Sequence, residues 1–378
     1  MEKVSAVRCE SYEEEYVYQA VKEAIKKIGF EFPKGKRVLI KPNIMSQNKP
    51  EQHTITHFSV INAICRLLKE QNNDIVIGES IAFYQKGLTK KAYEISGIQQ
   101  VAQKYDATLV EFEKVDLIRI TKDEYEIEGL DELFIPKILL EVDMVINACK
   151  LKSHSAMRLS GAIKNMYGCL PGGYKQKIHQ WVNSEFELSN IFIDIHKIIK
   201  PELSIMDAIV SLDGGPTALG KPIYTGSILA SENPVALDVV AASLIGYNAD
   251  DIPMLIQAKR REMINDFNDV QIVGELKPVQ FKRLVKEGLD RPYDNNSIFV
   301  KHTYVNLKID NSNCNNCGRC ITACPTKAIQ QKNECVELHT KLCINCYYCI
   351  SVCPNEAISI NPTLMNRLGW GIRRITGL

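Results

Sequence analysis

With 378 residues, of which 45% are hydrophobic and 24% charged, the chain has the composition of an ordinary globular protein and enough length for two or three domains. Its formal net charge of +1 argues against broad nucleic-acid binding, which depends on a basic face that neutralises phosphates. No apolar run approaches the roughly 18 residues that span a bilayer, and no signal segment opens the chain. We therefore expect a cytoplasmic protein with no transmembrane segment and no nucleic-acid partner.

The first 274 residues alternate short β-branched runs with longer amphipathic segments. Strands are predicted at residues 3–9, 37–40, 74–78, 144–148, 203–206, 227–230 and 269–274, with helices at 12–28 and 58–70 and a hairpin within 108–135. Most of these strand runs are continuously apolar, as in strands buried on both faces. The alternation predicts an α/β domain with a largely parallel sheet and flanking helices.

Polar residues follow four of the predicted strands. They are Lys41 with Asn43, Glu79 with Ser80, the run from Lys150 to His154, and Asp207 with Asp213. In sheets of this kind, ligands bind beyond the carboxyl ends of the strands. We therefore expect these side chains to face one pocket, in which the lysines would bind an anionic group such as a phosphate or a carboxylate.

These strand-end segments resemble the family called domain of unknown function 362. The matching pieces are Arg37-Val-Leu-Ile-Lys-Pro-Asn43, Thr56-His57, Gly78-Glu-Ser80, Lys150-Leu-Lys-Ser-His154, Lys164-Asn165 with Gly168, Asp213-Gly-Gly-Pro216 and Asn233-Pro-Val-Ala-Leu-Asp238. The resemblance covers roughly residues 1 to 260 and implies no established reaction. Cys149 and Phe58 depart from it, because the family more often has proline at both positions.

The predicted site falls into a binding set and a catalytic set. The binding set is Lys41, Asn43, Glu79, Ser80, Lys150, Lys164, Asn165 and Asp213, and the catalytic set is His154, Lys152 and Cys149. His154 is the best general acid or base, because the unperturbed pKa of histidine lies near neutrality. Solvated lysines and a structural histidine are the competing interpretations. A place in the core is the favoured interpretation for Cys149.

Nine of the thirteen cysteines lie between positions 314 and 353, and eight of them repeat one spacing. The two runs are Cys314-x2-Cys317-x2-Cys320-x3-Cys324-Pro325 and Cys343-x2-Cys346-x2-Cys349-x3-Cys353-Pro354. Cysteines two residues apart can hold adjacent corners of one iron-sulfur cube, while the fourth is turned toward the neighbouring repeat. We therefore predict two ligand sets, Cys314, Cys317, Cys320 and Cys353 for one cluster and Cys343, Cys346, Cys349 and Cys324 for the other.

Residues 306 to about 360 resemble a bacterial two-cluster ferredoxin, with both cysteine motifs complete. The resemblance implies two [4Fe-4S] clusters and one-electron transfer. A pair of zinc ribbons is the alternative, and the triple Cys-x2-Cys-x2-Cys run fits a cube better than a tetrahedral ion. Tyr347 and Tyr348, which lie between ligands, are expected to pack over a cluster.

The predicted domains are an α/β domain at 1–274, a linker at 275–303, a ferredoxin domain at 304–360 and a basic tail at 361–378. The tail contains Arg367, Arg373 and Arg374 and no acidic residue. It could touch a membrane surface weakly or bind an acidic partner, although docking on its own protein is favoured.

The sequence as a whole predicts an iron-sulfur oxidoreductase of unknown substrate. Two clusters would relay electrons between a low-potential donor or acceptor protein and a small anionic substrate or second cofactor at the strand ends. A flavin would suit that chemistry because it converts single-electron input to two-electron chemistry, but no motif demonstrates one. The alternatives are a non-catalytic electron carrier or maturation protein, whose large domain recognises a partner, and a binding module whose clusters are purely structural.

Overall fold

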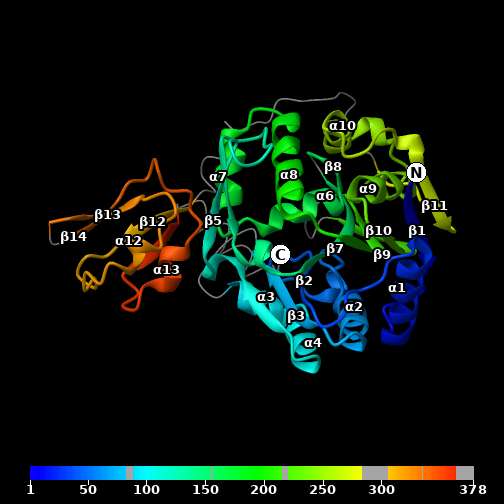
Figure 1. Ribbon diagram of the computed structural model, residues 1–378, viewed down its shortest axis with the longest axis horizontal. Helices are drawn as coiled ribbons and strands as arrows, with labels where there is room; N and C mark the ends of the chain where they lie inside the picture. Colours follow the sequence, from blue (N-terminus) through cyan, green and yellow to red (C-terminus); the bar gives the residue numbers. More distant parts are fainter. Residues whose placement is uncertain (82–87, 155, 215–219, 283–304, 334, 363–378) are drawn as a thin grey trace.

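The structure is a computed structural model that describes residues 1–81, 88–154, 156–214, 220–282, 305–333 and 335–362. Figure 1 shows a large α/β lobe beside a smaller lobe formed by the C-terminal part of the chain. The expected architecture, an α/β domain followed by a small domain of short strands and helices, is confirmed.

A mixed sheet of nine strands forms the centre of the large lobe. Its order is β11-β1-β10-β9-β7-β2-β3-β4, and β8 pairs with β7. The bounds are β1 Glu2–Arg8, β2 Arg37–Lys41, β3 Asp74–Glu79, β4 Thr108–Glu111, β7 Met144–His154, β8 Arg158–Ser160, β9 Leu203–Asp213, β10 Lys221–Ser231 and β11 Val270–Gly274. Neighbours from β9 through β7, β2 and β3 to β4 are parallel, so their carboxyl ends share one edge. Only β10 separates them from the parallel pair of β1 and β11.

Helices cover both faces of this sheet (Figure 1). They are α1 Glu14–Ile28, α2 Phe58–Glu70, α3 Leu88–Ile95, α4 Ile98–Lys104, α5 Ile138–Glu141, α6 Ala162–Asn165, α7 Tyr174–Trp181, α8 Glu185–Ile199, α9 Pro234–Leu244 and α10 Pro253–Arg260. Short 3-10 turns are η1 Pro50–Gln52, η2 Phe112–Lys114, η3 Met166–Cys169, η4 Ala249–Asp251 and η5 Phe267–Asp269. Among the described residues, no helix combines the length and the apolar character needed to cross a membrane.

Alternate residues of one strand enter two different cores. Leu39 of β2 belongs to the apolar core that contains Phe192 of α8, whereas Ile40 belongs to the core that contains Ile61 of α2. Successive side chains of a strand point to opposite faces, so a strand covered by helices on both sides must be apolar at every position. This two-sided burial explains the continuous apolar runs of the sequence.

Two segments of the large lobe refine the sequence predictions. The segment predicted as a hairpin is divided between two sheets: β4 is the edge of the main sheet, and β5 (Leu117–Thr121) pairs with β6 (Glu132–Pro136). Residues 275–282 of the predicted linker pack on the large lobe, where the Val279 N–H donates to the Leu244 carbonyl at 2.8 Å and Phe281 is buried. The rest of the predicted linker lies outside the described residues.

The small lobe contains two strand pairs and two short helices. β12 (Val305–Ile309) pairs with β15 (Ile358–Pro362), and β13 (Ile329–Lys332) pairs with β14 (Cys335–Leu338). The helices are α12 (Arg319–Thr322) and α13 (Tyr348–Val352). Residues 361 and 362 of the predicted tail are part of β15, and the arginines of that tail lie outside the described residues.

The two lobes meet at the loop that precedes α7. The Gly173 N–H donates to the Asn345 carbonyl at 2.9 Å, and the buried ring of Tyr347 covers this loop. A Cβ on Gly172 would lie 2.7 Å from the Tyr347 ring and 2.8 Å from the Cys346 carbonyl oxygen. Glycine is therefore required here for the close approach of two backbones.

We predict that Gly172→Ala loosens the contact between the lobes. Gly35→Ala is the matched control, because both glycines have positive φ (53° and 63°) but a Cβ on Gly35 would meet nothing within 4 Å. Both variants should bear the left-handed backbone penalty of about 1 kcal/mol. Only Gly172→Ala should also accelerate hydrogen exchange at the Gly173 amide. Equal exchange at this amide in both variants would contradict the tight contact.

Candidate functional site

Eight cysteines of the small lobe surround two cavities. One cavity is lined by Cys314, Cys317, Cys320 and Cys353, which we call the outer set. The other is lined by Cys324, Cys343, Cys346 and Cys349, which we call the inner set. The structure thus groups the cysteines as their spacing predicts, with the fourth cysteine of each run placed beside the first three of the other.

Backbone N–H groups point at the same sulfurs in both repeats. The first cysteine of each run accepts from the residue two positions later, Asn316 N to Cys314 Sγ and Asn345 N to Cys343 Sγ, both at 3.4 Å. The fourth accepts from the residue four positions later, at 3.2 Å for Cys324 and 3.3 Å for Cys353. Such donors stabilise thiolates, which are the form of cysteine that binds metal.

The donor set fits an iron-sulfur cluster better than a single ion. In the described parts of the chain, no three His, Cys, Asp or Glu side chains converge in a group that could hold one metal ion. The cysteines instead stand around cavities, as expected of ligands to a larger group. Burial raises the pKa of the Cys346 thiol to about 12 and that of Cys349 well above 9, so without a metal these thiols are uncharged.

The two sets differ in exposure and in contact with the large lobe. Cys317 of the outer set is exposed, whereas Cys343, Cys346 and Cys349 are buried. Lys177 of α7 donates from Nζ to the Cys343 carbonyl and, at 3.3 Å, to the Thr340 carbonyl. The inner set therefore lies against the large lobe, with a lysine of that lobe beside it.

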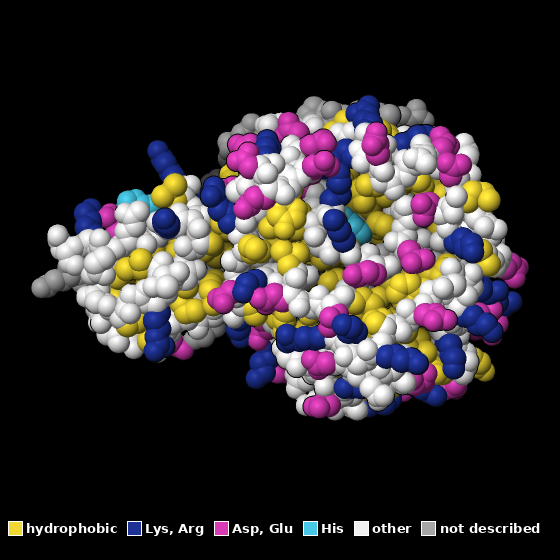
Figure 2. All heavy atoms as spheres, in the orientation of Figure 1, with side chains coloured by type: hydrophobic (Ala, Val, Ile, Leu, Met, Phe, Trp, Pro, Cys, Tyr) yellow, Lys and Arg dark blue, Asp and Glu magenta, His cyan; other side chains and the backbone are white. Residues whose placement is uncertain are grey.

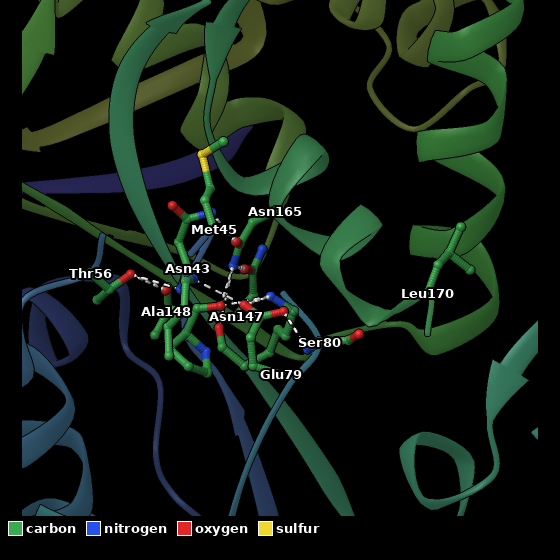
Figure 3. A network of polar contacts seen from close by, with 12 residues as sticks. Asn43, Met45, Thr56, Glu79, Ser80, Asn147, Ala148, Asn165 and Leu170 are labelled. Atoms are coloured by element: carbon green, nitrogen blue, oxygen red, sulfur yellow. Dashed lines mark hydrogen bonds and ion pairs between the residues drawn. The ribbon is translucent and has the colours of Figure 1, made fainter. Parts of the chain in front are cut away.

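A buried ion pair joins the ends of β2 and β3 (Figure 3). Lys41 Nζ lies 2.7 Å from Glu79 Oε2, and both side chains are at most 1% exposed. Glu79 also accepts the backbone N–H groups of Ile44 and Ser80, at 3.1 and 2.9 Å. A Cβ on Gly168 would lie 2.7 Å from Lys41 Nζ, so only glycine fits over the pair. The pair therefore fixes the loops that follow the two strands.

Three asparagines continue this network toward α6 (Figure 3). Asn43 Nδ2 donates to Asn165 Oδ1 at 2.8 Å, and Asn165 Nδ2 donates to Asn147 Oδ1 at 2.7 Å. Asn147 in turn donates to the Ala162 carbonyl at 2.9 Å. Asn43 and Asn165 were predicted as ligand-binding residues, and the structure uses these amide contacts to hold the strand ends and α6 together.

A second buried ion pair links β7 to β9. Lys150 Nζ lies 2.9 Å from Asp207 Oδ2 and donates to the Tyr12 hydroxyl at 2.8 Å, and that hydroxyl donates to Asp207 Oδ1 at 2.9 Å. Burial would raise the pKa of Asp207, but the Lys150 ammonium and the His57 N–H together hold it below its usual range. The charge of Lys150 is therefore balanced within the protein.

Lys152 and Lys164 lack such a carboxylate partner. The β7–β9 register shifts between Lys150 and Lys152, and Lys152 Nζ donates to two uncharged oxygens, Asn43 Oδ1 at 2.8 Å and the Thr54 carbonyl at 2.9 Å. Lys164 lies on α6 with its Nζ 5.7 Å from the centre of the Phe192 ring. Figure 2 shows histidine atoms beside Lys or Arg side chains on the face of the molecule that carries α6.

Two predicted site residues lie apart from this group. Cys149 is buried in the core, and its Sγ faces the Ile205 carbonyl at 3.7 Å. Strand alternation turns it away from Lys150, and burial raises its pKa well above 9, so the predicted reactive role is not supported. Asp213 lies at the end of β9, where its Oδ2 accepts the Lys282 N–H at 2.9 Å.

Sequence reasoning missed the residues that connect the two sites. Ser80 Oγ accepts the Gly172 N–H at 2.9 Å, and Lys175 Nζ donates to the Ser80 and Leu170 carbonyls at 2.6 and 2.7 Å. The run Gly172-Gly-Tyr-Lys-Gln-Lys177 was the available signal, since paired glycines mark a close backbone approach. The surface that packs on these glycines can be identified only from the tertiary structure.

Comparison with known proteins places both lobes. A family model described as Domain of unknown function (DUF362) matches residues 38–243, and one described as 4Fe-4S dicluster domain matches residues 306–354. A thylakoid-associated protein of Synechocystis sp. is 29% identical over 262 residues, which are 68% of this chain and 78% of that protein. The lactate racemase apoprotein of Thermoanaerobacterium thermosaccharolyticum aligns with a TM-score of 0.37 at 16% identity, over 62% of this chain and 55% of the racemase chain.

We predict that Glu79→Gln destabilises the large lobe by about 3–5 kcal/mol, because it leaves the buried Lys41 ammonium without a counter-charge. Glu14→Gln is the control, since it breaks an exposed pair with Lys104 at 3.0 Å and should change stability by at most about 1 kcal/mol. Urea unfolding followed by circular dichroism measures both. Similar small losses in the two variants would show that the buried pair contributes no more than a surface pair.

Proposed function

Because the chain belongs to the family described as Domain of unknown function (DUF362) and carries a 4Fe-4S dicluster domain, we propose that it is an iron-sulfur redox protein that exchanges electrons with a small anionic ligand. The outer and inner cysteine sets would each hold one [4Fe-4S] cluster. Such clusters, when bound, accept and release single electrons. The ligand, a substrate or a second cofactor, would bind at the strand ends of the large lobe.

The observation that carries this proposal is the contact between the inner set and the strand-end site. The Cys346 carbonyl packs on Gly172, whose N–H donates to Ser80 Oγ at 2.9 Å. Ser80 N donates at 2.9 Å to Glu79, the partner of Lys41. This short series of contacts gives a physical reason for one chain to contain both lobes, because electron exchange requires close approach.

The outer set would serve a protein partner. Cys317 is exposed, and the exposed residues around it are mainly uncharged, namely Asn311, Ser312, Asn313, Asn315, Asn316 and Asn355. A low-potential electron donor or acceptor protein could approach this side without displacing the large lobe. Three cysteines of the inner set, Cys343, Cys346 and Cys349, are buried, and Tyr347 packs against the loop before α7 beside them.

We predict that the fourth cysteines are exchanged between the two ligand sets. Cys353→Ala combined with Cys314→Ala removes two ligands of the outer set only, so about half of the iron should remain. Cys353→Ala combined with Cys343→Ala removes one ligand from each set and should cost iron at both. Cys335→Ala, at an exposed cysteine outside both cavities, is the control. The iron content of the anaerobically purified variants is the measurement. If the Cys353/Cys343 variant instead kept about half of the iron and the Cys353/Cys314 variant lost iron at both sites, each run of four cysteines would hold its own cluster.

The proposed function is tested by anaerobic redox titration of the native protein and a Lys177→Met variant. Lys177 places positive charge beside the Cys343 carbonyl, which favours the reduced state of the inner set. The variant should show a lower reduction potential for one cluster and an unchanged potential for the other. Lys332→Met is the control, because Lys332 is exposed and pairs with Glu337. Absorbance and extraction of the same preparations reveal any flavin.

Three outcomes would contradict parts of this proposal. Absence of reducible clusters would exclude a redox role. An unchanged reduction potential for both clusters in Lys177→Met would show that this lysine of the large lobe has no electrostatic effect on either cluster. Reducible clusters without any ligand at the strand ends would favour an electron carrier whose large domain recognises a partner.

A further inference from the structure

We infer that the strand-end site binds the phosphate group of its ligand, held by the ammonium group of Lys164 and by the Nε2–H of His154. The inference rests on the proposed function for the existence of a ligand, and it adds the chemical class of that ligand. It also separates Lys164 and His154 from Lys41, Lys150 and Lys152, whose ammonium groups have partners within the protein.

The balance of charge among the buried lysines selects this subset. Lys41 is paired with Glu79 at 2.7 Å and Lys150 with Asp207 at 2.9 Å. Lys152 Nζ donates to Asn43 Oδ1, the Thr54 carbonyl and Met45 Sδ, so its three donor positions are occupied within the protein. Within the described residues Lys164 has no hydrogen-bond or ion-pair partner. Its positive charge is thus left without a carboxylate, and a phosphate ester carries about −1.5 to −2 near neutral pH.

The environment of Lys164 shows the energetic cost that a ligand would relieve. Burial alone lowers its pKa to about 8, and no carboxylate lies close enough to raise it. An ammonium that leaves water without gaining an acceptor is strongly disfavoured, and an anion that binds it restores the lost interaction. Lys164 and His154 both keep partial exposure, so a ligand from solvent can reach them.

His154 presents a hydrogen-bond donor to this site. Its Nδ1 accepts the backbone N–H groups of Ala156 at 3.2 Å and Met157 at 3.1 Å, so the ring proton is on Nε2. Burial, together with Lys164, Lys152 and His179, lowers its pKa well below 6.5, and the ring is neutral. With Nδ1 occupied, His154 would donate to a ligand oxygen from Nε2, and its role as a general acid or base stays a prediction.

Asp238 holds α6, and with it Lys164, in place. Its two oxygens accept the N–H groups of Ala162 at 2.6 Å and Ile163 at 3.0 Å. A Cβ on Gly161 would overlap the Asp238 carboxylate, so the start of α6 has no freedom to shift. Asp238 belongs to α9, so its carboxylate caps the start of a different helix, α6.

The test measures anion binding by calorimetry on the oxidised, cluster-containing protein, with inorganic phosphate as the probe. Lys164→Met should weaken phosphate binding by about tenfold or more, and Lys164→Arg should restore most of it. Lys197→Met is the control, because Lys197 lies on the neighbouring helix α8 and pairs with Glu126 at 3.3 Å. Without anion, Lys164→Met should also raise the melting temperature, since it removes an uncompensated buried charge.

Sulfate provides the pH test, because its charge is constant in the range that matters. The groups that face Lys164 are Lys152 and His154 of β7, His179 of α7 and the Phe192 ring of α8. The pKa of His179 is lowered to about 4, so both histidines are already neutral near pH 7. Affinity for sulfate should therefore fall as pH rises through about 8, where free Lys164 loses its proton.

Equal affinity of native protein and Lys164→Met for phosphate, or no binding by native protein, would overturn the inference. Acetate binding as tight as phosphate would assign the site to a carboxylate and overturn the choice of phosphate. These measurements do not involve electron transfer. Failure here with a normal redox titration would refute the anion site alone, and anion binding without reducible clusters would refute the redox function alone.

Discussion

The cost of removing charge from water governs the strand-end region of this protein. Lys41, Lys150 and Lys152 are each at most 1% exposed, and each lies at the end of a parallel strand. Lys41 and Lys150 are balanced by carboxylates from neighbouring strands, and Lys152 donates to uncharged acceptors. Lys164, on α6, has no partner among the described residues, and its charge is the feature that a ligand would balance.

The same region explains the attachment of the small lobe. Gly172 is in contact with the backbone of Cys346 on one side and with Ser80 on the other, so the site and the inner cysteines share one loop. Lys177, the fourth residue of α7, donates to the Cys343 carbonyl. A close backbone contact thus joins the strand-end region to the inner cysteines, as the proposed electron exchange between them requires.

Several features of the fold were predictable because local patterns control them. Apolar runs such as Val38 to Ile40 identify strands covered on both faces, and the spacing of the eight cysteines predicts their grouping. The hairpin segment was less predictable. Residues 108–111 form an edge strand because β3 offers them a free side, and this pairing depends on the position of a distant strand.

At the strand-end site, residues adjacent in the sequence have different environments that the sequence does not predict. Asn165 and Lys164 are adjacent, and the sequence predicted the same ligand-binding role for both. The side-chain amide of Asn165 is hydrogen-bonded to Asn43 and Asn147, whereas the ammonium of Lys164 has no partner among the described residues. Cys149 and Lys150 are also adjacent, and strand alternation sends one to the core and the other to Asp207. By itself the sequence determined the parallel sheet, the cysteine grouping and the presence of lysines at the strand ends. Only the tertiary structure decided which lysines keep unbalanced charge, because the balance depends on carboxylates brought from other strands.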